Sequence, residues 1–125
     1  MVRAPAKARG LLHLRVGISA DFYLGPGRAD LLELIAETGS ISAAGRRMGM
    51  SYKRAWSLVQ ALNEGFGSPL VETSRGGAEQ GGASLTEAGA EVLGRYRSMQ
   101  RATEAVIAGD LEALAARVVD MSQKK

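Results

Sequence analysis

The chain has 125 residues, 46% of them apolar, a formal charge of +3 at neutral pH and no cysteine. This length indicates one domain, or one domain with an oligomerisation arm, and the missing cysteines exclude disulfide frameworks and thiolate metal sites. No apolar run approaches the roughly 20 residues that span a bilayer, and no hydrophobic signal core follows the basic N-terminus. We therefore expect a soluble, cytoplasmic protein whose mild positive charge favours a polyanionic partner.

The N-terminal part predicts a tail followed by a β-hairpin. Residues 1–10 are basic, and we interpret them as a solvated terminus, with a DNA-contacting arm as the alternative. The next apolar residues alternate with other residues at the period of a half-buried strand: Leu12, Leu14, Val16 and Ile18. Residues 22–24 form the returning strand, and Gly25, Pro26 and Gly27 end the hairpin.

The segment from Arg28 to about Thr38 predicts the first helix of a three-helix core. Leu31, Leu32 and Ile35 lie on its inward face, and Gly39 closes it.

The stretch from Ser40 to Leu62 predicts two helices joined by a tight turn. Ser40 and Ser51 are suitable N-caps, and Gly49 is a helix stop between them. Small residues in the first helix allow close approach to the second, which is typical of a helix-turn-helix. The alternative is an ordinary helical hairpin. In the first helix one face is formed by Ile41, Ala44 and Met48, and in the second one stripe is formed by Tyr52, Ala55, Val59 and Leu62.

A glycine-rich loop over residues 76–82 follows, between short strands at 70–72 and 84–85. The loop lacks the lysine and hydroxyl of a nucleotide-binding loop, so we interpret it as the tip of a wing, with Arg75 at its base as a phosphate or minor-groove contact.

A long helix is predicted from Thr86 to about Ala108, an interruption at Gly109 and Asp110, and a further helix beyond. Its apolar stripe predicts a homodimer. Packing onto the chain's own core is the alternative, which we prefer for residues 85–92. The candidate dimerisation residues are Val92, Tyr96, Met99, Val106, Leu111 and Leu114.

The charge distribution predicts where DNA would bind. Between Ser40 and Arg75 the basic residues outnumber the acids Glu64 and Glu72, and most lie in or near the two short helices. We assign Trp56 to the core and leave Tyr52 open between core and surface. The candidate DNA-binding residues are Ser51, Tyr52, Lys53, Arg54, Ser57, Arg46 and Arg75.

Residues for catalysis or metal binding are not found. His13 is the only histidine, and no serine has a histidine partner that we can place. We therefore expect that the protein is not an enzyme and has neither a catalytic residue nor a metal site.

The chain resembles the N-terminal DNA-binding domain of the ModE family, the molybdate-responsive regulators, whose winged helix is similar to that of LysR-type regulators. The matching segments are LLELIAETGSISAAGRRMGMSYKRAW and LVETSRGGAEQGGASLTEAG. This resemblance implies a two-fold symmetric dimer on a palindromic operator near genes of molybdenum uptake or cofactor metabolism. Family members bind molybdate in a separate downstream domain, for which this chain has no room before Lys125, so we expect no cofactor and no small-molecule ligand.

Together these features predict a mainly α fold with small β elements: a winged helix-turn-helix with an N-terminal β-hairpin and a long C-terminal dimerisation helix. The expected parts are a basic tail at 1–10, the DNA-binding domain at 11–85 and the C-terminal helices at 86–122. The expected function is sequence-specific DNA binding in transcription regulation. The alternative is a protein-interaction module on the same scaffold that binds another regulator.

Overall fold

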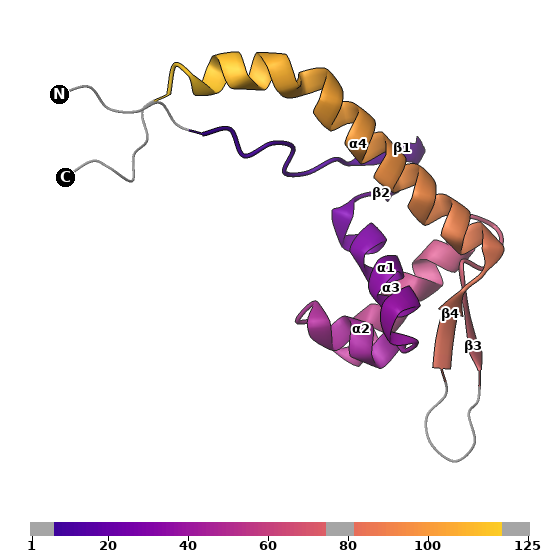
Figure 1. Cartoon of the computed structure of the whole chain (residues 1–125). Coiled ribbons are helices and arrows are strands. Elements are labelled where there is room, and N and C mark those ends of the chain that lie inside the picture. The colour runs from indigo at the N-terminus through magenta and orange to yellow at the C-terminus, as the bar shows by residue number, and fades with distance from the viewer. Residues whose placement is uncertain (1–6, 75–81, 119–125) are drawn as a thin grey trace. The chain divides into compact units, whose positions relative to one another are not determined.

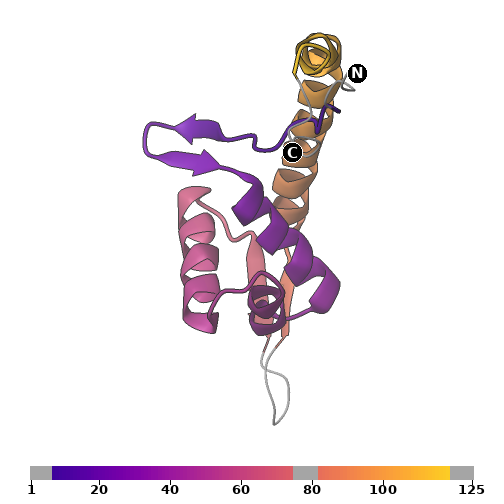
Figure 2. The ribbon, with the colours of Figure 1, turned by 90° about the vertical axis from the view of Figure 1, so that its left-hand side faces the viewer.

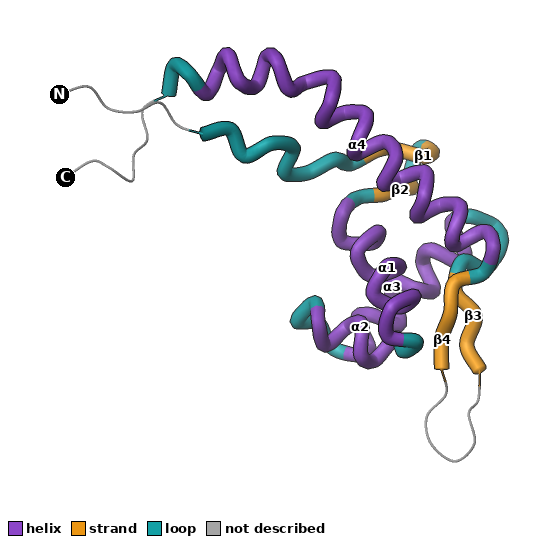
Figure 3. The backbone as a smooth tube through the Cα atoms, viewed as in Figure 1, coloured by secondary structure: helices purple, strands orange, loops and turns teal. Residues whose placement is uncertain are grey.

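A computed structural model describes residues 7–74 and 82–118. The chain divides into two compact units, one comprising residues 15–97 and the other combining residues 1–14 with 98–125. Helices dominate the described residues, and the strands form two separate antiparallel pairs (Figure 3). This arrangement confirms the expected mainly α fold with small β elements.

The N-terminal hairpin is confirmed but is shorter than its alternating pattern suggests. Strands β1 (Val16–Ser19) and β2 (Phe22–Leu24) pair antiparallel, with a register shift between Gly17 and Ser19. Residues 7–15 lie outside any regular element, because β2 has only three residues and can pair with no more of the preceding chain. Phe22 anchors the hairpin edge-on against Phe66, with the two ring centroids 5.1 Å apart.

Helix α1 (Pro26–Thr38) begins two residues earlier than its apolar pattern suggests. Gly25 is extended at the N-cap and Pro26 opens the first turn, where its missing N–H is not needed. Gly39 ends the helix in the left-handed region with φ 72°. The predicted inward face is confirmed, because Leu31, Leu32 and Ile35 are fully buried.

Helices α2 (Ile41–Arg47) and α3 (Tyr52–Gly65) form the predicted helix-turn-helix (Figure 1). Ser40 Oγ accepts the Ala43 N–H at 3.0 Å, and Ser51 Oγ accepts the Arg54 N–H at 3.1 Å. A Cβ on Gly45 would lie 3.0 Å from the Ala55 Cβ, so the glycine allows the two helices to approach closely. The core that these helices share comprises Leu24, Ala29, Leu31, Leu32, Ile35, Ile41, Ala44, Ala55, Val59, Leu62, Leu70, Val71, Ala83 and Tyr96.

Strands β3 (Val71–Ser74) and β4 (Gly82–Leu85) form the wing, in a register that pairs residue 71 with 85 and 74 with 82. The Ala83 N–H donates to the Gly39 carbonyl at 2.9 Å, which joins β4 to the end of α1. At the base of β3, Asn63 of α3 bonds the backbone of residues 70 and 71. The wing strands are therefore attached to both α1 and α3 (Figure 2). The glycine-rich tip at 75–81, with Arg75, lies outside the described residues.

Helix α4 (Glu87–Ala115) is continuous, so the predicted interruption at Gly109 and Asp110 and the separate following helix are wrong. A single glycine costs a helix only about 1 kcal/mol, and the surrounding alanines, leucines and glutamates favour the helix strongly enough to continue it. No helix among the described residues is both long and apolar enough to cross a bilayer.

Tyr96 of α4 was expected at a dimer interface, but its side chain is completely buried in this chain. It is therefore not available to a partner, and its assignment to the dimer surface is corrected. Burial raises the pKa of its phenol above the ordinary value of 10.0, although the Arg97 charge acts in the opposite direction.

Arg97 joins α4 to α1 through two carboxylates. Its guanidinium lies 2.7 Å from an oxygen of Asp30 and 2.8 Å from one of Glu33. Burial opposes the charge on Arg97, but the hydrogen bonds to both acids outweigh it and raise its pKa.

We expect Arg97→Met to lower the free energy of unfolding by about 1 kcal/mol, because it removes both ion pairs while keeping an apolar stem of similar length. The control is Arg95→Met, which removes only the exposed pair with Glu91 on the same helix and should change stability by less than about 0.5 kcal/mol. Urea unfolding of both variants measures the difference, and an unchanged free energy of unfolding for Arg97→Met would show that the Arg97 contacts do not stabilise the fold.

Candidate nucleic-acid interface

The first turns of α3 present an exposed polar and cationic surface. Tyr52, Lys53, Arg54 and Ser57 are all exposed, whereas Ala55 between them is buried. Ser51 is also exposed, and its hydroxyl caps the helix through the Arg54 N–H. The structure thus brings together the residues predicted on this helix, at the end that a helix-turn-helix directs into the major groove.

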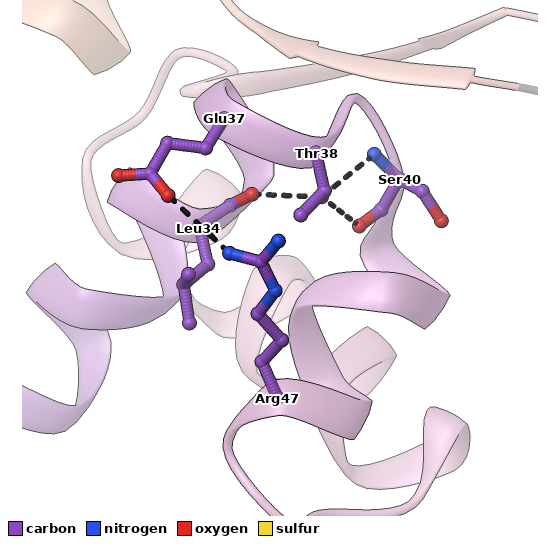
Figure 4. Close-up of polar contacts among 5 residues, drawn as sticks. All are labelled: Leu34, Glu37, Thr38, Ser40 and Arg47. Carbon is purple, nitrogen blue, oxygen red and sulfur yellow. Dashed lines mark hydrogen bonds and ion pairs between the residues drawn. The ribbon is translucent and has the colours of Figure 1, made fainter.

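The two neighbouring arginines of α2 have different partners. Arg47 lies 3.5 Å from a Glu37 carboxylate oxygen and so joins α2 to α1 (Figure 4). Beside it, the Thr38 hydroxyl donates to the Leu34 carbonyl at 2.7 Å within α1. The same hydroxyl accepts the Ser40 N–H at 3.2 Å, which stabilises the turn between the two helices. Arg46 instead donates to the Ser42 hydroxyl at 3.0 Å on the exposed side of α2.

This difference decides which of the two arginines keeps a charge that no carboxylate neutralises. Among the described residues, the ion pairs engage Arg47, Arg95 and Arg97, and none engages Arg46, Lys53 or Arg54. Three cations near the start of α3 therefore keep their charge uncompensated by a neighbouring carboxylate, as a phosphate-binding surface requires.

A cleft of about 650 Å³ separates α3 from the wing. Arg46 and the aromatic rings of α3 line it together with hydroxyl groups from α2 and β3, so its walls combine a cation, hydrogen-bonding groups and apolar planes. The lining residues are Ser40, Ile41, Ser42, Arg46, Tyr52, Trp56, Thr73, Ser74, Gly82 and Ala83.

The cleft corrects the assignment of Trp56, which was expected in the core but is 37% exposed. Tyr52, left open between core and surface, is 57% exposed. The signal was present in the sequence: residues 52 and 56 are four apart and lie to one side of the stripe formed by Ala55, Val59 and Leu62. The hydroxyls of Thr73 and Ser74 were missed, because only the folded wing brings them next to α2.

The remaining candidate dimerisation residues differ in exposure. Met99, Val106 and Leu114 are exposed, whereas Val92 and Leu111 are half-buried. Over residues 7–74 and 82–118, no group of three or more metal-ligating side chains is found.

Comparison with known proteins finds a family whose model matches this chain. Residues 28–90 match the model described as bacterial regulatory helix-turn-helix protein, lysR family. The matched segment extends from α1 through the wing to the start of α4. It therefore contains every described element that lines the cleft.

Curated relatives carry molybdenum-related names. The chain is 43% identical to the molybdenum-pterin-binding protein MopB of Rhodobacter capsulatus, over 74% of this chain and 33% of that protein. It is 44% identical to the molybdenum transport protein ModE of Herbaspirillum seropedicae, over 57% and 26% of the two chains. It is 36% identical to the DNA-binding transcriptional dual regulator ModE of Escherichia coli, over 66% and 32%. The chain spans about a third of the length of the curated relatives it matches.

Solved structures confirm the winged-helix arrangement. The CbnR_DBD–DNA complex aligns with a TM-score of 0.54 and 30% identity, over 73% of this chain and 97% of that one. The full-length CbnR complexed with its target DNA aligns with a TM-score of 0.53 and the same identity, over 73% of this chain and 29% of that one.

Proposed function

Because the chain belongs to the lysR family of bacterial regulatory helix-turn-helix proteins, a family of DNA-binding regulators and not a class of enzyme, we propose that it regulates transcription by binding specific duplex DNA. The observation that carries this proposal is the uncompensated cationic surface at the start of α3, beside a wing and a cleft. The relatives named ModE favour genes of molybdenum uptake as its targets. We propose that it acts in the cytoplasm.

In the proposed complex, the start of α3 enters the major groove. Lys53, Arg54 and Ser57 contact base edges or adjacent phosphates, and the Ser51 side chain keeps the helix capped. Arg46 binds a backbone phosphate beside the cleft. Arg75, outside the described residues, is proposed to contact the backbone next to the wing.

We further propose a homodimer on a palindromic operator. The support is the run of large apolar residues left exposed between residues 98 and 118: Met99, Val106, Leu114 and Val118, the last two of them 64% and 52% exposed. Selection of bound sequences from random duplexes tests both proposals. A palindrome with half-sites about one helical turn apart, or a multiple of that, is expected. A protein-interaction module would instead bind little DNA at any salt concentration.

Arg54→Ala should reduce operator discrimination. The guanidinium is exposed at the start of α3 and has no carboxylate partner among the described residues, so we expect affinity for the operator to fall by about ten-fold or more and affinity for random DNA to change much less. Fluorescence anisotropy with both duplexes measures this. Arg95→Ala, which removes an equal charge from α4, is the control. Equal losses on operator and random DNA would reject base readout by Arg54.

Arg46→Ala should weaken binding evenly across sequences. Because a phosphate contact releases one counterion, we expect the slope of log affinity against log salt to fall in magnitude by about one unit. Titrations at several salt concentrations measure the slope. Arg47→Ala is the matched control on the same helix, since Arg47 already pairs with Glu37. If Arg47→Ala lowers the slope and Arg46→Ala does not, the assignment of the two arginines is reversed.

A further inference from the structure

Two of the large apolar side chains left exposed on the first unit lie together on α3. Over the described residues between 15 and 97, the exposed large apolar residues are Ile18, Tyr52 and Trp56. Leaving an indole exposed forgoes burial free energy, so a pair of neighbouring exposed aromatics in a helix-turn-helix indicates a contact surface.

The two rings form a preordered surface. Their centroids are 6.5 Å apart and their planes differ by only 15°, as expected for aromatic residues four apart on one helix. Both rings line the cleft, across from the hydroxyls of Thr73 and Ser74 and beside Arg46. A surface that is already ordered loses little side-chain entropy when a ligand binds.

We propose that the Tyr52–Trp56 pair is a specificity determinant that packs against the 5-methyl group of a thymine in the operator. This inference rests on the proposed function, because it takes the ligand of the cleft to be duplex DNA. It adds to that function a residue, Trp56, and the chemical group that the residue reads.

The chemistry of the major groove favours thymine. Its base edges present hydrogen-bond donors and acceptors, and the thymine methyl is the apolar group among them. An indole has a single hydrogen-bond donor, its N–H, and no acceptor. Its ring therefore contacts a methyl group better than it contacts the polar edge of a base. Arg46 and the hydroxyls on the same cleft hold the sugar–phosphate strand next to that base, so one nucleotide satisfies both the polar and the apolar walls.

The test replaces operator thymines one at a time by deoxyuridine, which removes only the methyl group. For the unaltered protein, we expect the affinity to fall about four-fold at one thymine in each half-site and hardly at the others. Trp56→Ala should lower affinity for the thymine operator and should no longer distinguish thymine from deoxyuridine at that position. Ile18→Ala, which removes the other large apolar residue exposed among the described residues of this unit, should keep the full methyl effect. If Trp56→Ala also keeps it, the inference is overturned.

A second measurement needs no variant. Trp56 is the only tryptophan, so its emission reports on this surface alone. We expect operator binding to change the emission and the single deoxyuridine substitution to reduce that change. Identical emission of the free and bound protein would overturn the inference.

The outcomes separate the two proposals. If the protein binds a selected operator with a steep salt dependence but shows no coupling between Trp56 and the methyl, only this inference fails. If it binds no duplex, the proposed function fails and the inference fails with it.

Discussion

Gly89→Ala should destabilise the protein by about 3 kcal/mol or more, because the new Cβ would collide with the backbone of the chain that leads into the wing. Gly89 is buried, and a Cβ built on it would overlap the Leu70 carbonyl oxygen and lie 3.0 Å from its carbonyl carbon. Backbone atoms cannot move aside by changing a rotamer.

The surrounding hydrogen bonds prevent the helix from shifting instead. The Thr86 hydroxyl accepts the Gly89 N–H at 3.0 Å and donates to the Pro69 carbonyl at 2.7 Å. The Thr86 N–H donates to the Leu70 carbonyl at 2.9 Å. Moving α4 away to make room for a methyl group would break this set of bonds.

The matched control is Gly94→Ala on the same helix, where a Cβ has nothing within 4 Å. Alanine favours a helix over glycine, so this variant should gain up to about 1 kcal/mol. Urea unfolding followed by circular dichroism measures both variants. If Gly89→Ala were as stable as Gly94→Ala, the close approach of α4 to residue 70 would be wrong.

Asn63→Ala should lower the free energy of unfolding by about 3 kcal/mol, because the amide satisfies three backbone groups at once. Its Oδ1 accepts the N–H groups of Leu70 at 2.8 Å and Val71 at 3.2 Å, and its Nδ2 donates to the Val71 carbonyl at 3.3 Å. Leu70 and Val71 are both buried, so water cannot easily replace these bonds.

A conservative variant separates the contribution of the two accepted hydrogen bonds from that of the donated one. Asn63→Asp keeps the acceptor for both N–H groups but loses the donor to the Val71 carbonyl. We therefore expect its free energy of unfolding to lie between those of the natural protein and Asn63→Ala. Gln60→Ala, one turn away and exposed, should change stability by less than about 0.5 kcal/mol. Thermal and urea unfolding measure the series. If Asn63→Ala lowers the free energy of unfolding no more than Gln60→Ala does, the three Asn63 hydrogen bonds do not hold the wing in place.

The hydrogen bonds of Asn63 also matter for the proposed DNA binding. Asn63 lies on the helix proposed to enter the major groove and holds the first residue of β3, so it couples the position of the wing to that of α3. The polarity of Asn63 alone does not reveal this role, because its partners are seven and eight residues away in the chain.

Local chemistry in the sequence was enough to predict the helix-turn-helix, the first helix and the wing strands. The serine caps before α2 and α3, and Gly39 and Gly49 with φ 72°, act within a few residues of themselves, so their meaning does not depend on the rest of the fold. The apolar periods of α1 and of α3 after Tyr52 were correct for the same reason.

Only the tertiary structure decided which neighbour each ambiguous side chain meets. Trp56 borders the cleft because the wing lies beside α3. Tyr96 is in the core because α4 lies close to residue 70, an approach that Gly89 permits by having no side chain. Arg46 and Arg47 are adjacent in sequence, yet only the latter reaches Glu37 of α1. Caps and periods predict elements because they are short-range, whereas burial and pairing depend on contacts between segments far apart in the chain.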